Sequence, residues 1–144
     1  MVVRAERVVN VQASPAAIWE FIADPERRAT LISDVQEYEV VADGRVRWHV
    51  SLPIPLIDRT IPIETEETVR DPPNRVEFVG RSKAMRVVGE HVIAAENGTT
   101  RMTNTFTVDG KLPGVERYFK RRIEGEFDTL ERELFAYLEE RSES

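Results

Sequence analysis

The 144-residue sequence is long enough to bury the core of one domain, and we expect that domain to span residues 1–144. Its 20 Lys and Arg against 26 Asp and Glu give a net charge of −6, which argues against nucleic-acid binding as the main role. The absence of cysteine excludes disulfides and thiolate chemistry, and the absence of a long apolar run favours a cytoplasmic protein with no transmembrane segment.

The first 30 residues predict one strand followed by two short helices. Residues 3–12 alternate between apolar and polar side chains, with Arg7 as the one exception. Ser14-Pro15 is typical of a helix N-cap followed by a proline in the first helical position. That helix carries bulky apolar side chains and ends at Asp24-Pro25, which can itself begin a second short helix.

Six further strands are predicted in the middle of the chain. Turn signals at Asp43-Gly44, Asp71–Asn74 and Asn97-Gly98 separate several of them. Since the connections are short, the strands should pair mostly antiparallel. The predicted strand ranges are 35–42, 45–52, 60–70, 75–82, 86–96 and 99–109.

From Pro113 onward the sequence predicts one long amphipathic helix. Its apolar residues recur every three or four positions and therefore share one stripe. Because a lone helix cannot bury such a stripe, we expect the sheet to cover it and a hydrophobic pocket to lie between them. The stripe consists of Val115, Phe119, Ile123, Phe127, Leu130, Leu134 and Leu138.

The order of elements resembles the helix-grip fold of the START-like superfamily, also called SRPBCC. The segment Val9–Pro25, where a strand ends in Ser-Pro and a helix carries Trp before Asp-Pro, carries the resemblance together with Asn97–Arg101 and the terminal helix. This superfamily includes polyketide cyclases/dehydrases, coenzyme Q-binding proteins and the G subunit of carbon monoxide dehydrogenase. The resemblance implies an α+β fold in which a curved seven-stranded antiparallel sheet wraps around the long C-terminal helix, with two short helices after the first strand.

Strand alternation and the helical stripe indicate which side chains face the interior. Most should be plain core, and the polar ones need a partner or a ligand. Asn104, between Met102 and Phe106, is the clearest polar case, and its amide would bond either a neighbouring strand or a ligand. The candidate ligand-binding residues are Trp48, Val50, Ile61, Ile63, Phe78, His91, Met102, Asn104, Phe106, Phe119, Arg122, Ile123, Glu126 and Phe127.

Two titratable residues on the strands have alternative orientations. Strand 86–96 has two apolar faces, so its inward face stays open. If His91 faces inward, Gly89 beside it would leave local space, and the imidazole would be a structural group, a ligand-orienting group or an acid–base group. Glu67 follows the inward alternation of Ile63 and Thr65, but it lies near a strand end, where strands leave the core; we expect it to face solvent, with an inward position as the alternative.

On the long helix, Arg122 and Glu126 lie at the margin of the apolar stripe. They would form a surface ion pair at i,i+4 spacing or anchor the head group of a ligand. Gly125 costs about 1 kcal/mol relative to alanine in a helix interior, which close packing or room for a ligand would justify.

The segment 52–57 combines two prolines with four large aliphatic side chains. Because prolines interrupt regular pairing, we interpret this segment as an apolar loop at the rim of the pocket, with packing against the first helix as the alternative. A transient contact with a membrane surface or a protein is compatible with it. The rim residues are Leu52, Ile54, Leu56 and Ile57.

These observations favour a protein that binds or carries an apolar small molecule such as a lipid, a quinone or a polyketide-like compound, in a pocket of about 300–1,000 Å³. A cyclase or dehydrase using the same pocket is the first alternative, ranked lower because the sequence shows no convergent titratable pair. An accessory or assembly protein docking through residues 52–57 is the second. We expect no cofactor, no metal site and a monomer or homodimer.

Overall fold

The computed structural model describes residues 2–30, 35–51 and 60–143. Strands and helices follow one another in the predicted order. None of the described helices is both long and apolar enough to cross a lipid bilayer. The elements are β1 (Val2–Val11), α1 (Pro15–Ile22), α2 (Pro25–Thr30), β2 (Val35–Ala42), β3 (Arg45–Val50), β4 (Ile61–Asp71), β5 (Arg75–Arg81), β6 (Met85–Glu96), β7 (Thr99–Gly110) and α3 (Val115–Glu143).

The strands form one antiparallel sheet in the order β1-β7-β6-β5-β4-β3-β2. The local turn signals produce these connections: Gly44 and Gly98 have positive φ angles of 73° and 85°, which glycine adopts without steric cost. The first strand pairs with the last strand, so β1 and β2 form the two edges of the sheet. The predicted seven-stranded antiparallel sheet is confirmed.

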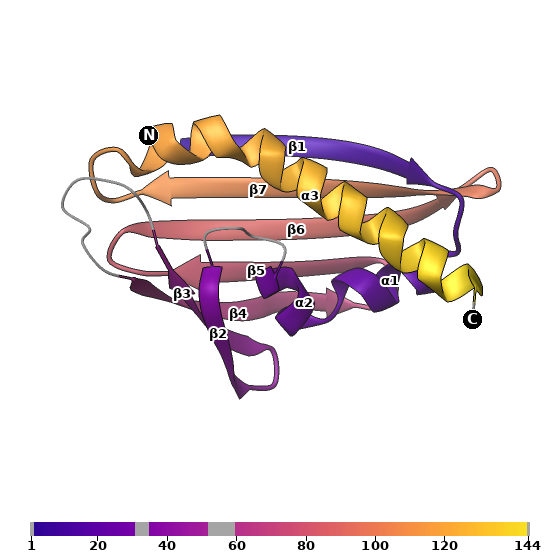
Figure 1. The fold of residues 1–144 in the computed structure, drawn as a ribbon, viewed down its shortest axis with the longest axis horizontal. Coiled ribbons are helices and arrows are strands. Elements are labelled where there is room, and N and C mark those ends of the chain that lie inside the picture. The colour runs from indigo at the N-terminus through magenta and orange to yellow at the C-terminus, as the bar shows by residue number, and fades with distance from the viewer. Residues whose placement is uncertain (1, 31–34, 52–59, 144) are drawn as a thin grey trace.

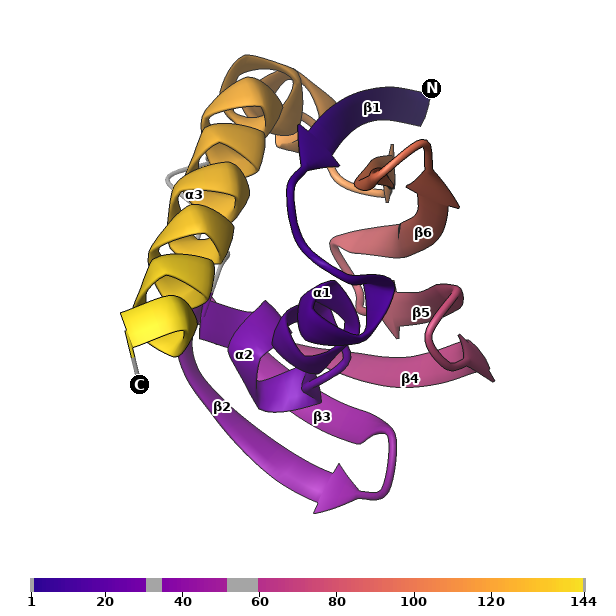
Figure 2. The same ribbon diagram turned by 90° about the vertical axis from the view of Figure 1, so that its right-hand side faces the viewer.

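Helix α3 crosses the concave face of the curved sheet diagonally, from β1 and β7 at its first turns to α1 near its end (Figure 1). Seen from one end of the molecule, the sheet bends around the interior and α3 closes the open side (Figure 2). Each buried apolar side chain of α3 stabilises this arrangement by about 1.5–3 kcal/mol. The stripe is buried at Val115, Phe119, Ile123, Phe127, Leu130 and Leu134.

The hydrophobic core consists of two clusters along α3. One cluster joins the first turns of α3, through Val115 and Phe119, to β3, β4 and β5. The other joins Leu130 and Leu134 to α1 and to β1, β6 and β7. Ile123 and Phe127 lie between these two parts of α3, and this is where the interior is hollow.

Arg7, the exception to the alternation of β1, attaches this edge strand to α3. Its guanidinium pairs with Glu124, with Asp128 at 2.5 Å and with Glu131 at 3.5 Å, and it lies 5.4 Å from the centre of the Phe127 ring. The hydrogen bond to Asp128 is the main reason that the pKa of Arg7 is raised. The break in the pattern therefore marks a helix–strand contact.

Replacing Arg7 with Met keeps an unbranched aliphatic stem at this position and removes the positive charge. We expect Arg7→Met to lower the free energy of unfolding by about 1–2 kcal/mol in dilute buffer, because three carboxylates of α3 lose their shared partner. The loss should shrink in concentrated salt, which screens their mutual repulsion. Urea denaturation at low and high salt measures both effects.

Arg4→Met is the matched control, since Arg4 is an exposed residue of the same strand that pairs with Glu6 at 3.5 Å. It should change the free energy of unfolding by less than about 0.5 kcal/mol. Equal losses for the two variants would contradict the assigned role of Arg7.

Candidate functional site

A pocket lies between α3 and the sheet, at the junction of the two core clusters, and it is partly open to solvent. Its volume is about 50 Å³, room for roughly four water molecules. The expected volume of about 300–1,000 Å³ is therefore wrong for this structure, because side chains fill most of the space. The lining residues are Arg28, Phe78, His91, Thr105, Phe106, Phe119, Ile123, Glu126, Phe127 and Leu130.

A second, smaller chamber of about 10 Å³ lies beside this pocket, toward β3 and β4. Phe106 and Phe119 line both spaces, so these two rings form the partition between them. Movement of the two rings would join the spaces into one longer cavity. The chamber is lined by Trp48, Val50, Ile63, Met85, Val87, Phe106 and Phe119.

His91 faces the pocket, which settles the orientation of β6. Val87, Gly89, His91 and Ile93 are its buried face. Across the β6–β7 pair, Nδ1 of His91 lies 2.7 Å from Oδ1 of Asn104. Since a carboxamide oxygen only accepts, Nδ1 donates and Nε2 keeps its lone pair. Asn104 therefore fixes the tautomer of His91, and it does not itself line the pocket.

The buried His91 imidazole is neutral at neutral pH. Burial lowers its pKa from 6.5 to about 4, the charge of Arg28 acts in the same direction, and the hydrogen bond with Asn104 opposes both. A neutral imidazole with a free Nε2 lone pair accepts a hydrogen bond from a ligand. It is a weak proton acceptor at neutral pH because its conjugate acid is so readily deprotonated.

Phe78 connects the aromatic and charged groups of the site. Its ring stacks against His91 at 6.3 Å, meets Trp48 edge-on at 5.8 Å and lies 5.1 Å from the guanidinium carbon of Arg28. A Cβ on Gly89 would fall 2.4 Å from this ring. The missing side chain of Gly89 therefore leaves space, as the sequence suggested, but Phe78 occupies that space.

Arg28, which lines the pocket, belongs to a buried ion pair. Arg28 of α2 donates to Glu67 of β4 at 2.6 Å and to the carbonyl of Ile22 at 3.0 Å, and Arg70 also binds Glu67 at 2.8 Å. Burial lowers the pKa of Arg28, and its bond to Glu67 opposes this. The expectation that Glu67 faces solvent is wrong: its side chain is only 8% exposed. Removal of one partner from such a pair typically costs about 3–5 kcal/mol.

Sequence reasoning missed Arg28 altogether. Glu67 was the available signal, because it continues the inward alternation of β4 after Ile63 and Thr65. A carboxylate at an inward position requires a cation or several donors. The choice of Arg28 as the partner depends on the packing of α2 over the sheet, which no local pattern encodes. Thr105 was also missed as a lining residue.

Trp48 carries an unsatisfied polar atom. Its side chain is 3% exposed, and its indole Nε1 has no hydrogen-bond partner among the residues that the structure describes. A buried donor without a partner costs about 1–3 kcal/mol. Buried polar groups in native proteins nearly always have a hydrogen-bond partner, so the Trp48 N–H is an exception.

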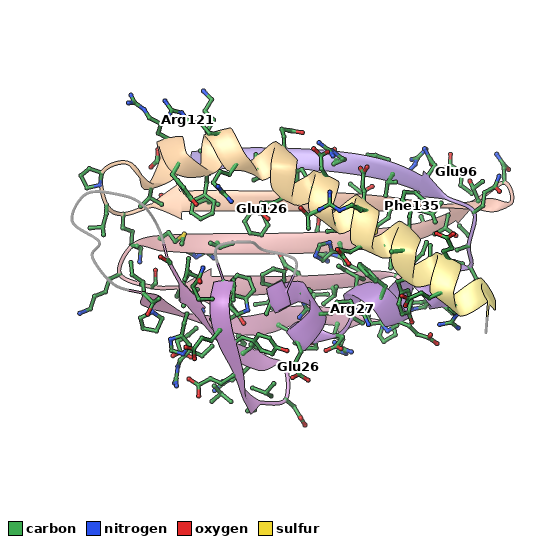
Figure 3. All side chains as sticks on the ribbon, viewed as in Figure 1. Glu26, Arg27, Glu96, Arg121, Glu126 and Phe135 are labelled. Carbon is green, nitrogen blue, oxygen red and sulfur yellow. The ribbon has the colours of Figure 1, made fainter. Side chains whose placement is uncertain are left out.

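On α3, Glu126 and Arg122 have different positions relative to the pocket. Glu126 lines it, on the side of the helix that lies over the sheet, whereas Arg121 points away (Figure 3). Arg122 pairs with Glu126 at 3.7 Å, lies 5.3 Å from the centre of the Tyr118 ring and does not line the pocket. A Cβ on the exposed Gly125 would meet nothing within 4 Å, so neither close packing nor ligand space explains this glycine.

The remaining predicted residues belong to the core or lie outside the described chain. Met102 is fully buried in the cluster beside α1, and Ile61 packs at the edge of the other cluster. Within residues 2–30, 35–51 and 60–143, no group of three or more His, Asp or Glu side chains is placed to hold a metal ion. The predicted rim residues Leu52, Ile54, Leu56 and Ile57 lie outside the described residues.

Comparisons with known proteins agree with this architecture. A family model described as polyketide cyclase/dehydrase and lipid transport matches residues 2–134. Among solved structures, an aromatase/cyclase from a Streptomyces species is similar with a TM-score of 0.70 at 17% identity, covering 97% of this chain and 93% of that one. No curated protein sequence matches the chain.

Two further solved structures cover nearly the whole chain. A START superfamily protein from Mycobacterium smegmatis has a TM-score of 0.69 at 16% identity, with 97% of both chains covered. A protein from Thermus thermophilus has a TM-score of 0.63 at 25% identity, with 98% of this chain and 96% of that chain covered. These similarities confirm the predicted helix-grip fold.

The lowered pKa of His91 predicts a specific loss of stability in acid. Between pH 6.5 and about 4 the unfolded chain binds a proton on this histidine and the folded chain does not, so stability falls as the pH falls through that window. In His91→Gln this contribution is absent. The stability advantage of the natural protein over the variant should therefore shrink by about 3 kcal/mol on going from neutral pH to about pH 4.

Urea unfolding across this pH range tests the prediction, and the difference between the two proteins cancels the shared titration of the carboxylates. In the control His49→Gln, which loses a surface contact with Glu39 at 3.1 Å, the contribution of the buried His91 remains, so the variant should keep the loss of stability that His91→Gln removes. A constant difference between the natural protein and His91→Gln would show that His91 is not buried in its neutral form.

Proposed function

The chain belongs to the polyketide cyclase/dehydrase and lipid transport family of the START-like superfamily, and on this premise we propose that it binds an apolar, oxygenated small molecule between α3 and the sheet. The observation that carries the proposal is the pocket at the junction of the two core clusters. Its walls are mainly aromatic and aliphatic, and its few polar groups come from separate elements. This combination is typical of small-molecule sites.

The ligand would gain most of its affinity from burial of apolar surface. Phe106, Phe119 and Phe127 supply broad ring faces, and burial contributes about 25 cal/mol per Å². Because the pocket holds only a few waters, a quinone- or lipid-sized ligand requires movement of the partition formed by Phe106 and Phe119. Binding would therefore be accompanied by rearrangement of these rings.

Polar groups would orient the ligand within this apolar space. Nε2 of His91 can accept a hydrogen bond from a hydroxyl group. Arg28 shares the carboxylate of Glu67 with Arg70, so it contributes a positive edge to the pocket.

A second candidate is catalysis of the cyclase or dehydrase type. The observation in its favour is that His91 and Glu126, which the sequence could not bring together, line one pocket. Against it, the pKa of about 4 makes His91 a weak base. The aromatase/cyclase from Streptomyces shares the fold at 17% identity, which supports the architecture and not the reaction.

Native purification followed by solvent extraction and mass spectrometry tests the proposal. We expect an apolar compound to be released in near-stoichiometric amount, and the emptied protein to bind members of a quinone panel. Ile123→Phe fills part of the pocket and should weaken binding of those quinones about tenfold. Phe135→Leu, at an exposed position of the same helix, should leave it unchanged.

Protein that is repeatedly empty and binds no quinone would contradict the proposal. The same extract separates the two candidate functions. A compound that is recovered unchanged after incubation with the protein favours binding or transport. A compound whose mass changes only in the presence of the protein favours catalysis, and His91→Gln should then abolish the change.

A further inference from the structure

Arg28 brings an unused hydrogen-bond donor to the pocket. Its Nη2 bonds to Glu67 at 2.6 Å and its Nη1 to the carbonyl of Ile22 at 3.0 Å. Its Nε–H has no hydrogen-bond partner among the described residues and, unlike the indole nitrogen of Trp48, is not fully enclosed by other atoms. Arg28 lines the main pocket but not the surface groove beyond the ion pair, so the accessible part of its guanidinium faces the pocket.

Glu67 does not depend on Arg28 alone. Arg70 donates to both oxygens of the Glu67 carboxylate, at 2.8 and 2.9 Å, and both residues line the surface groove. Arg70 is itself held by the carbonyl of Ala23 at 3.2 Å and lies 5.4 Å from the centre of the Trp19 ring. If Arg28 turned toward a ligand, Arg70 would therefore still neutralise Glu67, and no buried charge would lose its partner.

The other acidic groups near Arg28 have partners of their own. Glu126, which lines the pocket, pairs with Arg122 at 3.7 Å. Asp24, whose charge also acts on Arg28, accepts a hydrogen bond from the backbone N–H of Glu26 at 3.0 Å. The one carboxylate bound to Arg28 is shared with a second arginine, which leaves positive charge at this part of the pocket wall.

We propose that Arg28 is the subsite for a carboxylate at one end of the bound molecule, which makes the ligand an apolar carboxylic acid; this inference rests on the proposed function. The Nε–H of an arginine lies on the same edge of the guanidinium as one N–H of Nη2, so a carboxylate can accept both. Nη1 would meanwhile stay on the carbonyl of Ile22. A buried carboxylate requires such a cationic partner, and charge-assisted bonds are about twice as strong as neutral ones.

The test compares two pairs of probes that differ in charge but hardly in size: 2-naphthylacetate with 2-naphthylacetamide, and decanoate with decanamide. At neutral pH both acids are ionised. Calorimetric titration should show that the natural protein binds at least one acid about tenfold more tightly than its amide. The pair that binds more tightly tells whether the natural acid is aromatic or aliphatic.

Two variants separate contact with Arg28 from general electrostatic attraction. The double variant Arg28→Leu with Glu67→Leu keeps the net charge of −6 and leaves neither member of the pair buried alone, so it should bind acid and amide equally well. Glu67→Gln keeps an acceptor for Arg28 and removes the competing charge, so it should raise the affinity for the acid about threefold. Glu64→Gln, at an exposed position of the same strand that pairs with Arg47, is the control and should change neither affinity.

The possible failures are distinguishable. If the natural protein binds acids and amides equally, or if the double variant keeps the preference for the acid, the carboxylate subsite is overturned while the proposed function stands. If the double variant does not fold, Glu67→Gln decides, and an unchanged affinity for the acid overturns the subsite. If none of the four probes binds, the native extract decides: an apolar acid supports the subsite, a neutral compound overturns the subsite alone, and an empty extract overturns the proposed function with it.

Discussion

Burial of the apolar stripe of α3 is the constraint on which the rest of the structure depends. A helix of 29 residues with one apolar face requires a broad concave surface, and only a sheet that curves around it provides one. The pairing of β1 with β7 brings the edge of that sheet beneath the helix, and Arg7 fixes the two together by charge. Curvature, closure and helix position therefore follow from one hydrophobic requirement.

The hollow arises because polar groups interrupt the apolar packing at the middle of the sheet. His91 with Asn104, and Arg28 with Glu67, occupy interior positions where purely aliphatic residues would pack more tightly. A hydrogen bond within each pair holds its members in place, and each pair keeps part of the wall polar. Phe78 fits between them because Gly89 has no side chain. A site with few, well-fixed polar groups in an apolar wall suits recognition of a partly oxygenated molecule.

Local patterns in the sequence were sufficient to predict the fold. Turn residues such as Asn97-Gly98 and the spacing of the α3 stripe act over a few residues, so the element order and the antiparallel sheet could be predicted. The site depended on contacts between distant elements. The pairing of Glu67 with Arg28 and the occupation of the Gly89 space by Phe78 require the packed structure, as does the small volume of the pocket. Alternation nevertheless identified Asn104 as an inward polar residue, although its partner could not be named.

The central claim is that the space between α3 and the sheet can admit an apolar molecule. Crystals of the protein pressurised with xenon test this most directly, because xenon enters dry apolar cavities and makes no hydrogen bonds. We expect xenon beside Phe106, Phe127 and Leu130, with the ring of Phe106 or Phe119 displaced at higher pressure. Xenon found only in surface hollows, with the phenylalanine rings unmoved and ordered water filling the pocket, would contradict the account.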